Sequence, residues 1–171
     1  RVRRQRQMCI RDSYIDNPTL IKILDIADSS KYNIRTHICL NIQFNNNSVL
    51  IPLRKNLGEP NRKFGKIGFS VPSLSKPKAG LDYRYIMIIN NINYIRFDIP
   101  KISNSQIKII ENNYETIEKE AIEYIESYIR VANKGRVDRT ARFKESSLIN
   151  FHRELNIVDA NNNVRYNNEK K

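Results

Sequence analysis

The feature that most constrains the fold is a period-two repeat of apolar residues on both sides of an asparagine turn. Apolar residues occupy every second position from 38 to 44 and again from 49 to 53, and Asn45-Asn46-Asn47 separates the two runs. A period of two places successive side chains on opposite faces of a strand. Asparagine tolerates the left-handed backbone angles of a tight turn. The pattern therefore predicts a β-hairpin with one buried face.

Further strands are expected after the hairpin. The stretch 58–80 is rich in Pro, Gly, Ser and Lys and predicts loops, with a short strand near 65–71. The apolar run 85–89 predicts a buried strand. Asn90-Asn91 then predicts a turn into a strand at 94–97, so that these two strands would form a second hairpin.

Helices are expected mainly in the second half of the chain. Ser103 and Gln106 have the spacing of a capping box. Apolar residues at spacings of three and four then predict one long helix from about 104 to 133 and a short C-terminal helix over about 147–155. Near the N-terminus, the pattern from 17 to 27 fits a short helix but also a strand. These elements together predict the α+β class.

The helix 104–133 carries three tyrosines with two possible roles. Tyr114, Tyr124 and Tyr128 could form a stacking platform for bases, or they could lie at the edge of the core. Aromatic residues on an amphipathic helix more often belong to the core. The sequence favours the core and leaves the stacking role open.

The charge balance points to a polyanionic partner. The 171 residues suit one domain of ordinary size, 40% of them are hydrophobic, and the net charge is +12. Such an excess of positive charge favours nucleic acid. An anionic membrane surface is the weaker alternative, because no segment has the pattern of a basic amphipathic helix with a bulky aromatic face.

Cysteine and histidine are too few to predict a metal site. Cys9 and Cys39 are far apart and the histidines are His37 and His152, so we expect no metal and no cofactor. No apolar run has the length of a transmembrane segment, and no signal peptide is recognisable. These observations favour a cytoplasmic protein without a membrane partner.

Three parts of the chain differ in composition. Residues 1–13 are strongly basic and lack an apolar period. They could be an RNA-binding arm. We favour the alternative that they resemble translated adapter or vector sequence, a non-native or disordered leader. Residues 14–157 then form the folded domain, and 158–171 form a polar tail that is expected to be disordered.

The hairpin ends in the group with the best chemistry for binding a phosphate. Arg54, Lys55 and Asn56 follow the second strand directly. Strand ends often carry such residues simply because they reach solvent. Two basic clusters make the functional reading stronger. The first lies within 58–80 and the second within 133–144, and their cations are Arg62, Lys63, Lys66, Lys76, Lys78, Lys134, Arg136, Arg139, Arg142 and Lys144.

Three passages carry a family resemblance. They are LIPLRKN at 50–56, AGLDYR at 79–84 and FKESSLINFHREL at 143–155. In this order and spacing, the chain resembles the TenpN branch of the ToxN-like endoribonuclease toxins of type III toxin–antitoxin systems, over about Ser13 to Ile157.

The resemblance implies a fold and an activity. The fold would be a strongly bent, partly open antiparallel sheet, similar to the MazF barrel, with helices packed around it. The activity would be metal-free cleavage of single-stranded RNA to a 2′,3′-cyclic phosphate, leading to growth inhibition or abortive phage infection. The partner would be a repeated RNA pseudoknot that inhibits the toxin, in a closed protein–RNA assembly.

The chain departs from the family at the reactive loop. The family normally carries a Ser or Thr after Pro-Leu, with a Lys shortly after, whereas Arg54, Lys55 and Asn56 follow Pro52-Leu53 here. This departure leaves a catalytically inactive RNA-binding module as the alternative function. For the enzyme, we assign phosphate contact to Arg54, charge or proton donation to Lys55 and orientation of a phosphate oxygen to Asn56.

The remaining candidates are less specific. His152 could act as an acid or a base, or it could simply pack beside Phe151. Arg84, between Tyr83 and Tyr85, could bind phosphate or a base, or could be a strand-edge residue. The residues assigned to RNA binding are Arg62, Lys63, Lys66, Lys78, Tyr83, Arg84, Arg136, Arg139, Arg142, Lys144 and Ser147.

Overall fold

The structure, a computed structural model, describes residues 6–8, 17, 19–24, 37–96 and 101–158. The tail expected at 158–171 lies outside these residues except for Val158, as does most of the leader expected at 1–13. Three residues of that leader form strand β1 (Arg6–Met8), which pairs with two other strands. That residues 1–13 are a non-native or disordered leader stays a prediction.

The centre of the fold is an antiparallel sheet of seven described strands in the order β6-β7-β3-β2-β1-β9, with β8 also paired to β3. Its two end strands do not pair with each other in the described part of the chain, so the sheet is not a closed barrel. The α+β class is confirmed, and the bent, barrel-like form stays a prediction. The other strands of this sheet are β2 (His37–Phe44), β3 (Asn47–Arg54), β6 (Gly68–Ser70), β7 (Gly80–Asp82), β8 (Met87–Ile88) and β9 (Ile95–Arg96).

The first hairpin is confirmed as β2 and β3, but the prediction of a single buried face is wrong, because positions 39–42 and 49–52 are all buried. The two strands pair from Cys39 opposite Pro52 to Phe44 opposite Asn47. Asn45 and Asn46 both have positive φ angles, 45° and 65°. Two consecutive left-handed residues are what a tight two-residue hairpin turn requires, which is why asparagines occupy it.

The prediction of a second hairpin is wrong. β8 pairs with β3, β9 pairs with β1, and a 3₁₀ helix η2 (Ile92–Tyr94) lies between β8 and β9. Asn90 does not form a tight turn, because its side chain accepts a hydrogen bond from the Ser48 amide and donates one to Asn47 Oδ1. These bonds hold the end of β8 against the start of β3.

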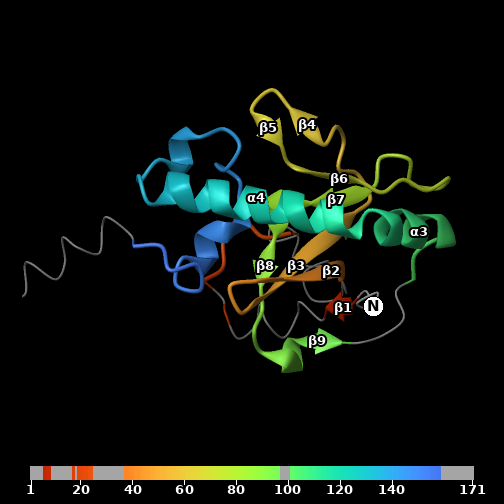
Figure 1. Cartoon of the computed structure of the whole chain (residues 1–171), viewed down its shortest axis with the longest axis horizontal. Coiled ribbons are helices and arrows are strands. Elements are labelled where there is room, and N and C mark those ends of the chain that lie inside the picture. Colours follow the sequence, from red (N-terminus) through yellow and green to blue (C-terminus); the bar gives the residue numbers. More distant parts are fainter. Residues whose placement is uncertain (1–5, 9–16, 18, 25–36, 97–100, 159–171) are drawn as a thin grey trace, which may run out of the picture.

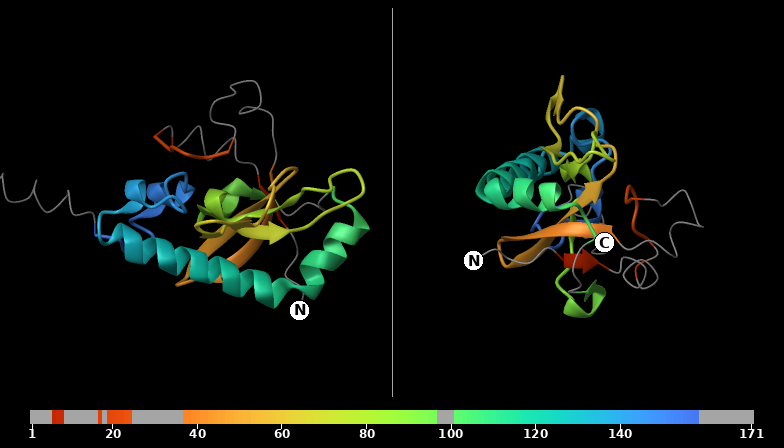
Figure 2. Two further views of the ribbon diagram at one scale, coloured as in Figure 1. Left: turned by 90° about the horizontal axis from the view of Figure 1, so that it is seen from above. Right: turned by 90° about the vertical axis from the view of Figure 1, so that its right-hand side faces the viewer.

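A smaller sheet of two strands stands apart from the main one. β4 (Asn61–Arg62) and β5 (Gly65–Lys66) form a short hairpin within the stretch expected to be mostly loop. Figure 1 shows this hairpin projecting from the body of the molecule, and the right-hand view of Figure 2 agrees. The strand expected near 65–71 is thus split between β5 and β6.

The long helix is two helices. α3 (Asn104–Asn112) begins with the predicted capping box, and α4 (Tyr114–Ala132) follows after a break at Asn113. Asn113 Nδ2 donates to the Ile109 carbonyl oxygen at 2.8 Å, which gives that carbonyl a partner where the helix stops. In Figure 2, α3 turns away from the axis of α4, and α4 lies across one face of the sheet.

The end of the domain is less helical than predicted. Ser147–Phe151 form the 3₁₀ helix η4, capped by the Ser146 side chain, and turns follow it. Residues 19–24, expected to be a helix or a strand, form neither. Backbone groups of Ile21 exchange two hydrogen bonds with the Asn150 side chain, so this segment is attached to η4.

The core lies between α4 and the sheet. Tyr124 and Tyr128 of α4 are fully buried there, and Tyr114 is half-buried. The core role of the helix tyrosines is therefore confirmed for Tyr124 and Tyr128. Their rings contact Phe143 edge-on, with centroids 5.2 and 5.6 Å away.

Candidate functional site

The end of β3 lies beside the start of β7, and this antiparallel pairing assembles the site. Leu53 is opposite Leu81 and Arg54 is opposite Gly80, so Arg54 comes within reach of Asp82. The Asp82 side chain is completely buried. A buried carboxylate needs charged or hydrogen-bonding partners to remain ionised.

Two arginines satisfy Asp82. Arg54 Nη1 donates to Oδ2 at 2.9 Å, while Arg84 donates from Nε to Oδ1 at 3.0 Å and from Nη2 to Oδ2 at 2.8 Å. The Arg84 amide also donates to Oδ1 at 3.1 Å. Hydrogen bonding to Asp82 raises the pKa of Arg84 above its ordinary value. One negative charge thus holds two positive ones, which leaves a net charge of about +1 at this point.

The two guanidinium groups flank an aromatic ring and reach solvent. The Tyr85 ring centroid is 4.8 Å from Arg54 Cζ and 5.7 Å from Arg84 Cζ. The arginine side chains are 32% and 22% exposed. A planar donor held in a fixed orientation at the surface suits a phosphate or carboxylate ligand.

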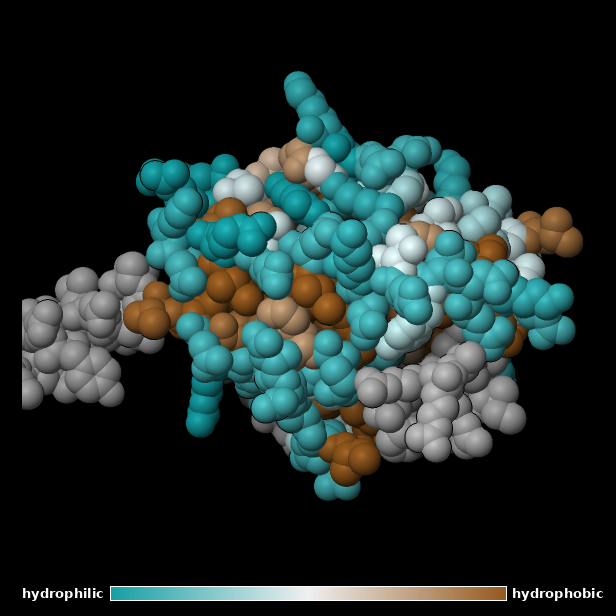
Figure 3. Space-filling model, viewed as in Figure 1, coloured by the Kyte–Doolittle hydropathy of each residue, from teal (hydrophilic) through white to brown (hydrophobic). Residues whose placement is uncertain are grey.

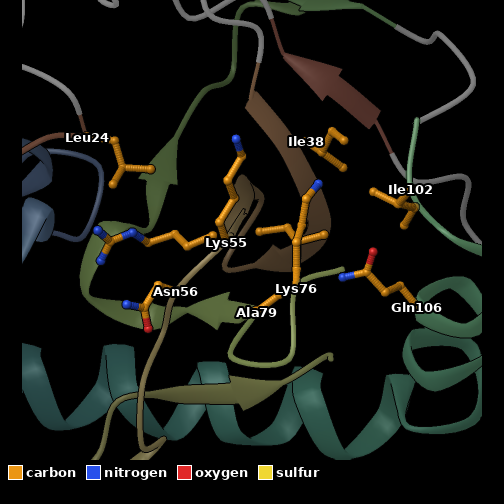
Figure 4. Close-up of a pocket in the computed structure, with 10 residues that line it drawn as sticks. Leu24, Ile38, Lys55, Asn56, Lys76, Ala79, Ile102 and Gln106 are labelled. Atoms are coloured by element: carbon orange, nitrogen blue, oxygen red, sulfur yellow. The ribbon is translucent and has the colours of Figure 1, made fainter. Parts of the chain in front are cut away.

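A pocket of about 340 Å³ begins beside Arg54. Lys55, Asn56 and Lys76 also line it, and in Figure 4 the Lys55 and Lys76 side chains extend toward the same space. The rest of the described lining is Leu24, Ile38, Leu53, Ala79, Ile102 and Gln106. Gln106 is buried and its Nε2 donates to the Val71 carbonyl, so it belongs to the wall. The pocket therefore combines cations with an apolar wall.

The structure brings together three of the four residues assigned to catalysis. Arg54, Lys55 and Asn56 line the pocket, and His152 is not among its described lining residues. His152 is half-buried with Nε2 2.9 Å from the Tyr128 hydroxyl. Its described geometry therefore supports the packing alternative rather than a role in this pocket.

Two residues assigned to RNA binding are in the interior, so these assignments are corrected. Tyr83 is fully buried, its hydroxyl donates to Glu120 at 2.9 Å, and burial raises its pKa. Ser147 is also fully buried, and its hydroxyl hydrogen-bonds to the Arg84 and Ile86 carbonyl oxygens. Both side chains stabilise the fold and cannot contact RNA from outside.

Lys66 and Arg142 are half-buried and hold elements together. Lys66 forms an ion pair with Glu120 of α4. Arg142 donates from Nε and Nη2 to the Lys66 carbonyl oxygen at 3.0 and 2.7 Å, and burial lowers its pKa. The other cations assigned to RNA binding are exposed, apart from Arg84: Arg62, Lys63, Lys78, Arg136, Arg139 and Lys144.

Sequence reasoning missed three parts of the site. Asp82 was quoted only as part of a motif, Lys76 only as one cation of a loop, and Tyr85 only as a neighbour of Arg84. The sequence does contain a signal for Asp82. This acidic residue follows an apolar segment and stands two positions before an arginine, and an acidic residue that becomes buried needs a partner.

The described residues contain no group of three or more histidine, cysteine, aspartate or glutamate side chains arranged to hold a metal ion. None of their helices combines the length and the apolar character needed to cross a membrane.

Comparisons with known proteins give no match. No protein-family model, curated protein or solved structure matches the chain.

Proposed function

We propose that the protein is a metal-independent endoribonuclease of the toxin type, cutting single-stranded RNA at the pocket beside Arg54. One observation carries the proposal: Arg54, which shares buried Asp82 with Arg84, lines a pocket that Lys55 and Lys76 also line. Such an arrangement stabilises the charge that develops on a phosphate during transesterification.

The reaction would use these residues in distinct roles. The RNA 2′-oxygen attacks phosphorus, the bond from phosphorus to the 5′-oxygen breaks, and a 2′,3′-cyclic phosphate forms. Arg54 binds the non-bridging oxygens. The Lys55 ammonium gives a proton to the leaving 5′-oxygen. The 2′-hydroxyl proton passes to solvent, because the described lining of the pocket has no carboxylate or imidazole.

Cleavage in EDTA tests the proposal directly. We expect the purified protein to cut single-stranded RNA in EDTA and to leave cyclic-phosphate ends. Lys55→Ala should lose most of this activity, whereas Lys108→Ala, at an exposed position of α3, should keep it. Equal activity of both variants would show that Lys55 does not take part in cleavage. In bacteria, expression of the wild type should stop growth and Lys55→Ala should not.

An RNA-binding module without catalysis is the second candidate. It is favoured by the absence of a hydroxyl residue directly after Pro52-Leu53 and by the position of His152 at Tyr128. In the same assay, this function would give retarded but intact RNA.

The inhibiting partner in this proposal is a repeated RNA pseudoknot that covers the same basic surface in the cytoplasm. Short tandem repeats in the DNA upstream of the reading frame would encode it. RNA of that repeat length should then copurify with the protein and block cleavage.

A further inference from the structure

The β4–β5 hairpin presents an exposed aromatic side chain away from the pocket. Arg62 is paired with Gly65, so Lys63 and Phe64 form the tip. The Phe64 side chain is exposed, at 44%, and its neighbours Arg62 and Lys63 are exposed as well. Lone exposed apolar residues are common, so exposure by itself assigns no role. The anchoring of the hairpin and the charges around its tip provide the argument.

The hairpin is held rigidly at its base. Arg142 donates two hydrogen bonds to the Lys66 carbonyl oxygen, and the Arg142 guanidinium lies over the Tyr124 ring, 5.2 Å from its centroid. The Ile67 amide donates to the Pro60 carbonyl at 2.8 Å and joins the two segments that enter and leave the hairpin. The Lys66–Glu120 ion pair attaches the hairpin to α4. Little conformational entropy is therefore left to lose when a ligand binds at the tip.

Next to the tip, the backbone at Gly65 packs closely against the Arg142 side chain. Gly65 has a φ angle of +120°, and an added Cβ would lie 3.3 Å from the Arg142 Cδ and Nε atoms. Only glycine adopts this backbone angle without strain. The chain thus uses a residue without a side chain to bring Arg142 close, which fixes the direction of the hairpin.

Cations predominate in the chain segment that carries the tip. Arg62 Nη2 donates to the Leu57 carbonyl at 3.2 Å, and the Leu57 amide donates to the Lys78 carbonyl at 2.7 Å, so the segments carrying Arg62 and Lys78 are joined. Glu59 is the one acidic residue between 57 and 80 on this part of the chain. Figure 3 shows hydrophilic side chains around the projecting hairpin, which Figure 1 labels.

We propose that Phe64 is a stacking platform for an unpaired base of single-stranded RNA, with Arg62 and Lys63 contacting the adjoining phosphates. An aromatic face beside cations is the combination by which proteins bind single strands, and a duplex would keep its base faces covered. The proposal rests on the proposed function for the identity of its ligand, and it places a second contact for the substrate outside the pocket.

Binding is measured with a 2′-O-methyl oligonucleotide carrying 2-aminopurine, because this RNA lacks the attacking hydroxyl and its base loses fluorescence on stacking. We expect Phe64→Ala to weaken binding roughly 5- to 150-fold, the range for removal of a stacking aromatic, and to abolish the quenching. Phe64→Tyr should restore both. Phe64→Leu keeps apolar bulk without an aromatic face and should not restore the quenching.

Leu74→Ala is the matched control, since Leu74 is fully exposed on another loop and should leave binding unchanged. Wild-type affinity and quenching in Phe64→Ala would overturn the proposal. So would equal affinity for a blunt RNA duplex, or no binding of the oligonucleotide at low salt.

Cleavage of ordinary RNA separates the two proposals. If the wild type never cuts RNA but Phe64 controls quenching, the nuclease fails and the stacking platform stands. If RNA is cut through Lys55 and Phe64→Ala changes neither binding nor quenching, the stacking platform fails and the nuclease stands.

Discussion

Asp82 shows how one buried residue can organise a charged surface. Its carboxylate accepts hydrogen bonds from two arginines that lie 28 and 2 residues away in sequence. Without that carboxylate, the Arg54 and Arg84 guanidinium groups would repel each other at close range. Asp82 therefore sets the spacing and direction of the cations proposed to bind phosphate.

Asp82→Asn tests this role through stability. The change removes the charge but keeps the size of the side chain, so both arginines lose their counter-ion. Removing one partner of a buried ion pair costs about 3–5 kcal/mol. Because both arginines are partly exposed, we expect a smaller loss of about 2 kcal/mol in the free energy of unfolding, measured in urea.

An exposed carboxylate gives the comparison for Asp82. Asp138, whose side chain is 82% exposed, lies 3.6 Å from the Lys22 amine. Asp138→Asn should change the free energy of unfolding by less than about 1 kcal/mol, because exposed pairs contribute little. Equal losses in the two variants would show that burial of Asp82 does not matter.

Ser147→Ala tests the corrected role of Ser147. Its buried hydroxyl serves two backbone carbonyls, and loss of a buried hydrogen bond costs about 1–3 kcal/mol. We expect a lower free energy of unfolding and unchanged RNA binding at a temperature where the variant is folded. Ser75→Ala, at an exposed position, should alter neither quantity. Weaker RNA binding by folded Ser147→Ala would restore Ser147 to the interface.

At the scale of elements, sequence patterns predict correctly those elements whose residues interact with near neighbours in the chain. The β2–β3 hairpin follows from period-two alternation and a turn of asparagines, and the start of α3 follows from its capping box. The break at Asn113 could not be read, because the apolar period of three and four continues across it. The side-chain bond from Asn113 to Ile109 that accompanies the break does not alter that period.

Non-local pairing explains the other errors. β8 and β9 have the spacing of a hairpin, but each pairs with a strand far away in sequence. The site shows the same limit. Arg54, Lys55 and Asn56 were found because a strand ends there, whereas the partnership of Arg54 with Asp82 depends on the pairing of β3 with β7.

Arg142→Lys tests whether the β4–β5 hairpin is anchored as described. Lysine keeps the charge but cannot place two N–H groups on one carbonyl in the plane of a guanidinium. We expect a loss of about 1 kcal/mol in the free energy of unfolding and faster hydrogen exchange of the amides of residues 61–67.

The exposed Arg139 provides the control for Arg142. Arg139→Lys should leave exchange in the hairpin unchanged. If Arg142→Lys also leaves it unchanged, the two bonds to the Lys66 carbonyl do not hold the hairpin. The rigidity on which the stacking platform depends would then have to come from the Lys66–Glu120 pair and the bond from the Ile67 amide to the Pro60 carbonyl.

For the whole molecule, burial of ionisable groups in the core sets a limit at alkaline pH. Burial raises the pKa of the Cys39 thiol to about 12, and burial also raises the pKa of Tyr124 to about 12. In the unfolded chain, the thiol loses its proton above about pH 8.5 and the phenol above about pH 10. The folded state then binds more protons than the unfolded state.

The sign of the effect follows from this difference. The contribution of the neutral Cys39 thiol and Tyr124 phenol to the free energy of unfolding is fully present below their pKa values in the unfolded chain. It is lost as the pH rises from those values through the pKa values of the folded state. Each group lowers the free energy of unfolding by up to about 1.4 kcal/mol per pH unit in its window. We expect urea midpoints to fall from about pH 9 and to fall more steeply above about pH 10.

Cys39→Ala separates the thiol from the phenol. The variant should be less stable at every pH because it leaves a small cavity in the core. Its free energy of unfolding should nevertheless fall less steeply than that of the wild type between about pH 8.5 and 10, because the Cys39 thiol titrates before the Tyr124 phenol in the unfolded chain. A slope equal to that of the wild type in this interval would contradict the prediction, because it would mean that the Cys39 thiol titrates at the same pH in the folded and the unfolded state.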